Sequence, residues 1–324
     1  MEQGYSEELI EKNLCQTEIL DKYFIDLSLA SHHFLAKLFV DNNENNNYIY
    51  NVDNGWYVYD TYNVLQYYGD KFPLSDNITK TLQAELKTKY NLLINTISPD
   101  LPKFKKYSSI YSSVYKNIGS NTYKKGIIEE LMKHDEKKDI DKLIDSNEML
   151  ISFNDMVFDF SIGKYRNIQK SDYIMTTTGY NAPIEKNDKI RDDLNNIVKS
   201  IFEKEDNIKF FYESIGFSLF TNRFEKLHMW SGVGGNGKGL IMEIISKAFG
   251  EYFYVPDNQF LTTKYRSDRP NPSLYNTRNK KLVMVSKPEA DKDGDITFNI
   301  EFVKKLTGRD DVTTRDLHKS NITF

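Results

Sequence analysis

The residues most able to do chemistry lie in one glycine-rich octapeptide, which consists of Gly232, Val233, Gly234, Gly235, Asn236, Gly237, Lys238 and Gly239. Its spacing matches the phosphate-binding pattern in which four residues separate a glycine from a Gly-Lys pair. Glycines let the backbone fold around a polyphosphate with its N–H groups pointing inward, and the lysine reaches the β- and γ-phosphates. The alternative is a glycine-rich turn that contains a lysine by chance. Because the flanking segments also fit, we predict that residues 232–239 and Leu240 bind ATP.

The elements around this loop must present it to a ligand. Leu227–Trp230 is apolar and predicts a short strand before the loop. A helix is expected after it, and its positive N-terminal end favours phosphate charge. Gly250 is placed to end that helix. One helix face is expected to carry Leu240, Ile241, Ile244, Ile245 and Ala248.

The loop departs from the usual pattern at Gly239, where serine or threonine normally stands. That hydroxyl ligates Mg²⁺, and glycine has none. Binding of Mg²⁺ would therefore depend on water or on another carboxylate. The next apolar run, Lys281–Ser286, predicts a buried strand of a parallel sheet, after which such a carboxylate could lie.

The rest of the chain predicts a mainly helical region before an α/β core. Residues 1–40 are expected to be helical, with Ala30, Phe34, Leu35 and Leu38 on one face. Asp53-Asn54-Gly55 separates two aromatic runs and predicts a hairpin near 48–60. A second hairpin is expected in 149–175, turning at 161–163, and helices are expected near 190–201 and 210–220. We divide the chain into a helical N-terminal domain (1–147), a connecting hairpin and helix (148–205) and a P-loop core (206–324).

Composition limits the class of protein. The 324 residues are 39% hydrophobic and 28% charged, which is enough for a packed core. The net charge of −4 gives no global indication of nucleic-acid binding. The single cysteine, Cys15, excludes an intrachain disulfide and a cysteine-based zinc site. No apolar run approaches the length of a membrane span and no signal peptide is apparent, so we expect a soluble intracellular protein without a membrane partner.

The loop and four further segments resemble the helicase part of viral and phage primase-helicases of superfamily 3, including the poxvirus and giant-virus type. The loop has the short form GGNGKG, and the other segments are His32–Asp60, Ile151–Asn181, Phe211–Arg223 and Lys304–Lys319. Their order and spacing together carry the resemblance. It implies an AAA+-like P-loop core and an ATP-driven helicase for viral or phage genome replication, in the host cytoplasm if the protein is viral. It also implies a homo-hexameric ring around single-stranded DNA, with primase and polymerase as possible partners.

Two departures from the family bear on turnover. The family places an acid directly after the apolar strand, where this chain has Lys287; Glu289 is the substitute candidate for catalysis and for holding Mg²⁺, and Asp291 is a weaker one. The family's asparagine sensor and arginine finger would lie after Phe324. We therefore expect the C-terminal catalytic parts to be missing, through truncation, a split gene or degradation of the copy.

The resemblance also implies that residues 304–319 form a DNA-contacting segment. Its DNA-binding candidates are Arg309, Arg315, His318 and Lys319, although interleaved acids also fit a solvated charged face. Two functions compete with an ATP-hydrolysing helicase module. One is a nucleotide-binding or assembly fragment without turnover, and the other is a P-loop kinase acting on a small molecule.

Overall fold

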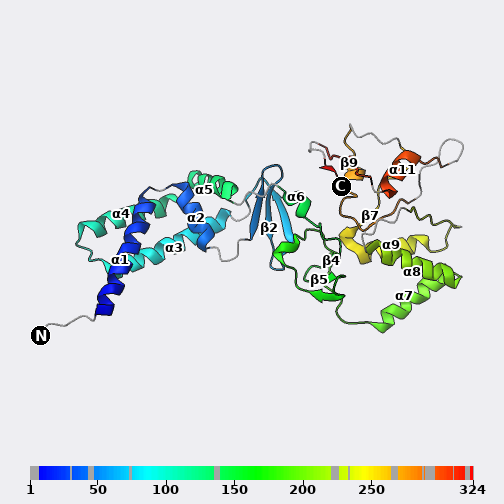
Figure 1. The fold of residues 1–324 in the computed structure, drawn as a ribbon, viewed down its shortest axis with the longest axis horizontal. Coiled ribbons are helices and arrows are strands. Elements are labelled where there is room, and N and C mark those ends of the chain that lie inside the picture. The colour runs from blue at the N-terminus through cyan, green and yellow to red at the C-terminus, as the bar shows by residue number, and fades with distance from the viewer. Residues whose placement is uncertain are drawn as a thin grey trace. The chain divides into compact units, whose positions relative to one another are not determined.

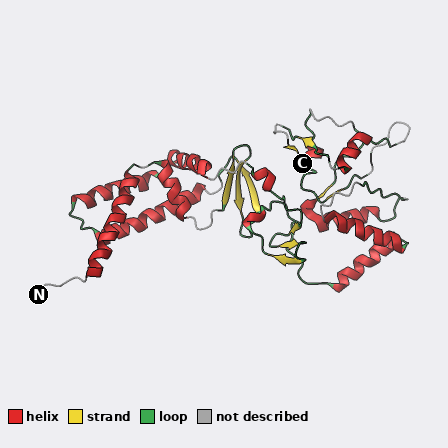
Figure 2. Cartoon of the chain, in the orientation of Figure 1, coloured by secondary structure: helices red, strands yellow, loops and turns green. Residues whose placement is uncertain are grey.

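The computed structural model shows a mixed α/β protein that consists mainly of helices with small sheets (Figure 1, Figure 2). It describes residues 7–29, 31–42, 47–72, 75–134, 139–219, 226–232, 234–263, 269–286, 288, 296–308, 310–317 and 322–323. The chain divides into two compact units. The first consists of Met1–Asp60 and Leu65–Asp141, and the second of Thr61–Val64 and Lys142–Phe324. The predicted division into three domains stays a prediction.

The first unit is built on helices α1 to α5. They span Glu7–Ser28, His32–Asn42, Ser75–Thr96, Pro102–Asn117 and Asn121–His134, and the short helix α6 (Ile140–Leu143) follows. Their shared core is rich in leucine and aromatic residues, including Phe24, whose ring stacks on that of Tyr107 with centroids 4.8 Å apart.

Residues 7–28 and 32–40 are helical, as predicted, in the two helices α1 and α2. Ser31 caps the start of α2, its side chain accepting a hydrogen bond from Phe34 N at 3.2 Å. Of the expected face, Leu35 is fully buried, and Phe34 and Leu38 are partly buried against the same core. Ala36 and Phe39 are the other buried residues of α2. Ala30 lies outside the described residues.

The predicted hairpin near 48–60 is confirmed. Strands β1 (Tyr48–Asn51) and β2 (Gly55–Tyr59) pair antiparallel, with Asn51 opposite Gly55. The Asn51 side chain organises the turn by accepting hydrogen bonds from the backbone N–H groups of Asp53 and Asn54, at 3.0 and 2.9 Å. A third antiparallel strand, β3 (Leu65–Gly69), pairs with β2 and was not predicted.

The second unit begins with a three-stranded antiparallel sheet instead of a single hairpin. Its strands are β4 (Leu150–Ser152), β5 (Val157–Asp159) and β6 (Lys164–Arg166). The expected turn at 161–163 joins β5 to β6, and Gly163 adopts the positive φ of 65° that it requires. The residues before that turn form two strands, β4 and β5, instead of one. A tight turn separates them, and it is closed by Phe153 N donating to the Met156 carbonyl at 2.8 Å.

Three helices form the main apolar core of the second unit. They are α7 (Asp188–Ile201), α8 (Glu205–Leu219) and α9 (Lys238–Phe249), and the helices predicted near 190–201, near 210–220 and after the glycine loop correspond to them. The remaining elements are η1 (Lys170–Asp172), η2 (Gly250–Tyr252), α10 (Pro272–Tyr275), α11 (Ile300–Thr307), the parallel pair β7 (Phe253–Tyr254) and β8 (Leu282–Val283), and the antiparallel pair β9 (Thr313–Thr314) and β10 (Ile322–Thr323).

Three expectations around the glycine loop need correction. The buried positions of α9 are Ile241, Ile245 and Phe249, four residues apart, whereas Leu240 is 47% exposed and Ala248 is exposed. Residues 227–230 form no strand, because none of the described residues pairs with them. Within the apolar run 281–286, only β8 is a strand. It pairs parallel with β7, as predicted, but it is half-buried where a buried strand was expected.

Across the described part of the chain, no helix is both long enough and apolar enough to cross a membrane.

Candidate functional site

The glycine loop leads directly into helix α9. Gly237 caps the helix with a φ of 87°, and Gly235 has a φ of 78°, while Asn236 between them does not have a positive φ. Such alternation turns successive backbone N–H groups toward one side and forms an anion-binding concavity. The positive end of the α9 dipole lies at the same place. The loop therefore has the local geometry of a phosphate site.

Lys238 folds back across the loop that precedes it. Its ammonium nitrogen, Nζ, donates hydrogen bonds to the carbonyl oxygen of Gly232 at 2.9 Å and to Oδ1 of Asn236 at 2.7 Å. The first and last parts of the octapeptide are thus brought together around one positive charge. A side chain on Gly232 would crowd this arrangement, since its Cβ would lie 2.5 Å from Nδ2 of Asn236 and 3.2 Å from Nζ of Lys238.

The glycines of the loop differ in what they require. A Cβ on Gly237 would lie 2.6 Å from Cγ1 of Ile201 at the end of α7, in addition to its unfavourable φ. A Cβ on Gly239 would meet no atom within 4 Å. Position 239 therefore has room for a serine or threonine side chain, and the glycine there is a property of this sequence.

The elements behind the loop fix it through apolar packing. Ile241 and Ile245 of α9 are buried in one cluster with Val198 of α7 and Phe211 of α8. Trp230, two residues before the loop, is half-buried in the same cluster, with its ring centroid 5.8 Å from that of Phe211. The loop thus begins and ends on residues anchored in one core.

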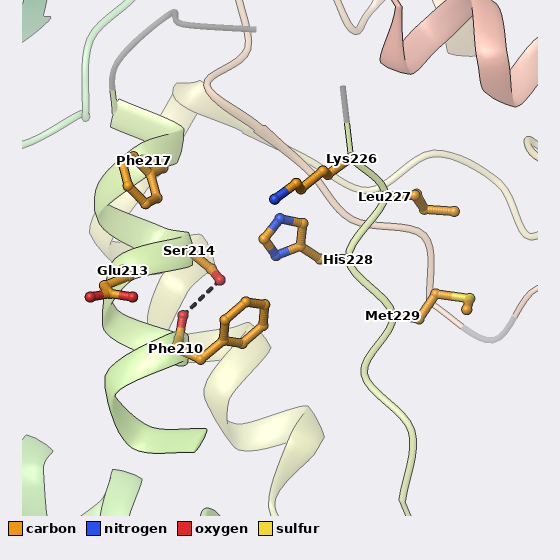
Figure 3. Close-up of a pocket in the computed structure, with 8 residues that line it drawn as sticks. All are labelled: Phe210, Glu213, Ser214, Phe217, Lys226, Leu227, His228 and Met229. Carbon is orange, nitrogen blue, oxygen red and sulfur yellow. Dashed lines mark hydrogen bonds between the residues drawn. The ribbon is translucent and has the colours of Figure 1, made fainter. Parts of the chain in front are cut away.

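A pocket of about 380 Å³ lies beside helix α8 (Figure 3). It is formed by one face of α8 and the segment 226–229, and the ring of Phe210 stacks on that of His228 with centroids 5.4 Å apart. None of the predicted ATP-binding residues that the structure describes lines it. Since the geometry that suits a phosphate is found in the loop, we place the candidate site there and not in this pocket.

One partly buried acid of the second unit was missed by sequence reasoning. Asp145 accepts hydrogen bonds from the backbone N–H of Met175 at 2.8 Å and from the hydroxyl of Thr176 at 2.7 Å. Burial raises the pKa of its carboxyl, although these hydrogen bonds act in the opposite direction. Burial likewise lowers the pKa of Lys280 and of Lys281, whose ammonium groups donate to backbone carbonyls. No motif marks these residues, because their partners are distant in sequence.

Several predicted site residues cannot be placed. Those outside the described residues are Val233, Lys287, Glu289, Asp291, Arg309, His318 and Lys319. Arg315 is half-buried just after β9, and its carbonyl oxygen accepts a hydrogen bond from Asn271 N at 3.0 Å. The structure therefore brings Gly232, Asn236 and Lys238 together and leaves the acidic and DNA-binding candidates as predictions.

The described residues suit a phosphate better than a metal ion. They contain no group of three or more histidine, cysteine, aspartate or glutamate side chains that could hold a metal. At the loop, Lys238 and backbone N–H groups offer only donors to a ligand. Mg²⁺ prefers oxygen ligands and usually binds together with the phosphates of its substrate.

Comparison with known proteins gives three viral relatives, each carrying the name "Putative helicase". The relative from Acanthamoeba polyphaga mimivirus is 27% identical over 306 residues, which are 91% of this chain and 31% of that protein. The relative from Invertebrate iridescent virus 3 is 30% identical over 149 residues, 44% of this chain and 15% of its own length. The relative from Invertebrate iridescent virus 6 is 28% identical over 200 residues, 60% of this chain and 20% of its own length. The chain thus spans about a third or less of these curated relatives.

A family model described as "D5 N terminal like" matches residues 36–202. This range is slightly more than half of the 324 residues and ends at the close of α7, before the glycine loop. The predicted resemblance to viral helicases is supported at this level by the names of the relatives. The chain belongs to the D5 N terminal like family.

Proposed function

We propose that this chain is an ATP-binding module of a DNA helicase that acts in viral genome replication. The observation that carries the proposal is the glycine loop, in which two positive-φ glycines and the ammonium of Lys238 surround the N-terminus of α9. The helicase names of the viral relatives, one of which aligns with 91% of this chain, support the same role. Because the chain covers only 31% of that relative, the activity of a whole protein is part of the proposal.

Each residue of the loop has a distinct part in the proposed binding. The backbone N–H groups near Gly235 and Gly237 donate to phosphate oxygens, and the α9 dipole adds favourable charge. Lys238 exchanges its contacts with Gly232 and Asn236 for the β- and γ-phosphates. Asn236 keeps the lysine oriented before the nucleotide enters. Bound Mg²⁺ would neutralise phosphate charge, with Glu289 as the candidate carboxylate.

Nucleotide binding without turnover is the second candidate function. Gly239 supplies no hydroxyl for Mg²⁺, and Lys287 stands where the family places an acid. A lysine cannot hold a metal or accept a proton from water while it is charged. Phosphate release from ATP with and without single-stranded DNA separates the two functions, because a helicase module hydrolyses ATP and a binding module only retains it.

The DNA-binding and assembly parts of the proposal rest on the family resemblance and on the relatives' names. In this scheme the chain works in a homo-hexameric ring, and Arg309, Arg315, His318 and Lys319 contact single-stranded DNA. Contacts of this kind are made to phosphates, so binding should weaken steeply with salt and depend little on sequence.

The first test is the substitution Lys238→Ala in the full chain. The variant removes charge-assisted hydrogen bonds worth about 1.5–3 kcal/mol each, so we expect ATP to bind at least about ten-fold more weakly by titration calorimetry. Lys247→Ala is the matched control, because Lys247 lies on the same helix, is 77% exposed and pairs with Glu243 one turn away. If the wild-type chain fails to bind ATP, or if both variants bind it equally well, the proposed site is wrong.

A further inference from the structure

The C-terminal end of α9 is held by a segment far from it in sequence. We call residues Thr176–Tyr180 the strap. The hydroxyl of Tyr180 donates a hydrogen bond to the carbonyl oxygen of Ala248 at 2.6 Å. That carbonyl lies in the last turn of α9, where carbonyl groups have no partner within the helix. The strap therefore satisfies a group that the helix itself leaves open.

Further hydrogen bonds join the strap to the residues that follow α9. Thr177 and Glu251 are joined twice, since Glu251 N donates to the Thr177 carbonyl and Thr177 N donates to Oε2 of Glu251, both at 3.2 Å. The Tyr252 hydroxyl donates to the carbonyl of Thr176 at 2.9 Å. The strap and the helix end thus form a connected set of hydrogen bonds, not a single contact.

Gly250 lets the two segments approach closely. Its φ is 54°, and a Cβ at this position would overlap the carbonyl group of Thr178. The backbone of the strap therefore lies directly against the residue that terminates α9. Only glycine combines this φ with this approach without steric strain.

The strap is itself fixed to the sheet that precedes it. Thr178 N donates to the Ser152 carbonyl at 2.9 Å, and Ser152 N donates to the hydroxyl of Tyr252 at 3.1 Å. At its other end, Asp145 accepts hydrogen bonds from the backbone and the side chain of Thr176. The strap therefore connects β4 with the end of α9 through hydrogen bonds along its length.

We propose that the strap positions the glycine loop for nucleotide binding and that Tyr180 is a positioning residue for it. The inference rests on the proposed function, because it concerns the same loop. Helix α9 carries the loop at its N-terminus and the strap at its C-terminus, and its 12 residues form one uninterrupted element about 18 Å long. The buried face of Ile241, Ile245 and Phe249 is packed in the core, so a shift at one end moves the other.

If the strap and the glycine loop are linked through α9, the effect of the strap on ATP binding must equal the effect of ATP on closure of the strap. Loosening the strap should weaken ATP binding, and ATP should in turn reduce opening of the strap. We therefore expect the amide hydrogens of Thr177, Thr178 and Glu251 to exchange more slowly when ATP and Mg²⁺ are added to the wild-type chain. Because ATP stabilises the whole unit that binds it, a purely structural strap would slow only as much as backbone amides elsewhere in the same unit, such as those of β6, whereas a linked strap slows more.

The deciding experiment compares Tyr180→Phe with Tyr212→Phe in the full chain. Both tyrosines are 38% exposed, and each hydroxyl makes a hydrogen bond, that of Tyr212 going to Oδ1 of Asn195 at 2.7 Å. The two variants lose the same chemical group, and only the first lies in the strap. We expect similar losses of stability to urea, but an ATP affinity that falls about two- to ten-fold in Tyr180→Phe alone.

Each outcome has one meaning. Equal ATP affinity in the wild-type chain and in both variants, with unchanged exchange of the strap, overturns the inference and leaves the proposed site intact. Absence of ATP binding by the wild-type chain overturns the proposed function instead. An equal loss of affinity in both variants also overturns the inference, because the effect would then follow general destabilisation and not the strap.

Discussion

We expect two glycines of the loop, Gly237 and Gly239, to respond in opposite ways to replacement by serine. Gly237 has a φ of 87° and lies against Ile201, whereas the space around Gly239 is open. We expect Gly237→Ser to displace the loop, destabilise the chain by about 1–3 kcal/mol and weaken ATP binding. Gly239→Ser should be tolerated, and its hydroxyl should make ATP binding several-fold tighter with Mg²⁺ than without it.

Calorimetric titration with ATP, in Mg²⁺ and in EDTA, measures both effects. The two positions lie on either side of Lys238, so each variant is the control for the other. Weaker binding by Gly239→Ser, or no effect of Gly237→Ser, would show that the loop does not hold phosphate in the proposed way.

At the scale of elements, a second pair of opposed glycines consists of one glycine at a helix end and one inside a helix. Gly250 terminates α9 at a φ of 54° against the strap, whereas Gly216 lies inside α8, where an added Cβ would meet no atom within 4 Å. We expect Gly250→Ala to destabilise the chain by about 2 kcal/mol or more, because strain and overlap add. Gly216→Ala should stabilise it by up to about 1 kcal/mol, through the higher helix propensity of alanine.

Urea unfolding followed by far-UV circular dichroism compares the two variants with the wild-type chain. The test is whether each substitution lowers or raises the free energy of unfolding, because the local φ and the neighbouring atoms determine the sign of that change. Stabilisation by Gly250→Ala would contradict the close approach of strap and helix end on which the positioning of α9 depends.

Elements with local determinants could be predicted from the sequence. Asn54-Gly55 predicted the hairpin correctly, because turn residues act on the backbone within a few positions. The spacing around Lys238 correctly predicted that a helix starts there. The amphipathic helix α7 followed from its periodicity. Local chemistry thus accounts for the loop and for the helices on which it is built.

Elements held by distant partners could not be predicted. The strand β3 lies in a region that the sequence predicts to be mostly helical, and its pairing with β2 decides its state. The strap is similar, since Tyr180 meets Ala248 and Thr176 meets Asp145 across 68 and 31 positions. For residues 227–230 the sequence predicted a strand, but strands also need a partner, and none is found among the described residues.

At the scale of the whole molecule, each unit has a core of its own and one tryptophan. Trp56 is fully buried in the core of the first unit. Trp230 is half-buried in the main core of the second unit, two residues before the glycine loop. Since the chain contains two tryptophans in all, replacing either one leaves a fluorophore that reports on a single unit. The location of nucleotide binding can therefore be read from unfolding.

We expect ATP with Mg²⁺ to stabilise the unit that Trp230 reports and not the unit that Trp56 reports. At about 100 times the dissociation constant, a ligand that binds only the folded state adds about 2.7 kcal/mol. For a urea dependence of about 1–3 kcal/mol/M, the unfolding midpoint of Trp56→Phe should rise by about 1 M or more. The midpoint of Trp230→Phe, followed through Trp56, should stay where it is. A rise confined to the Trp56 signal would place the nucleotide in the first unit, away from Lys238, because binding stabilises the part of the chain that contains the site.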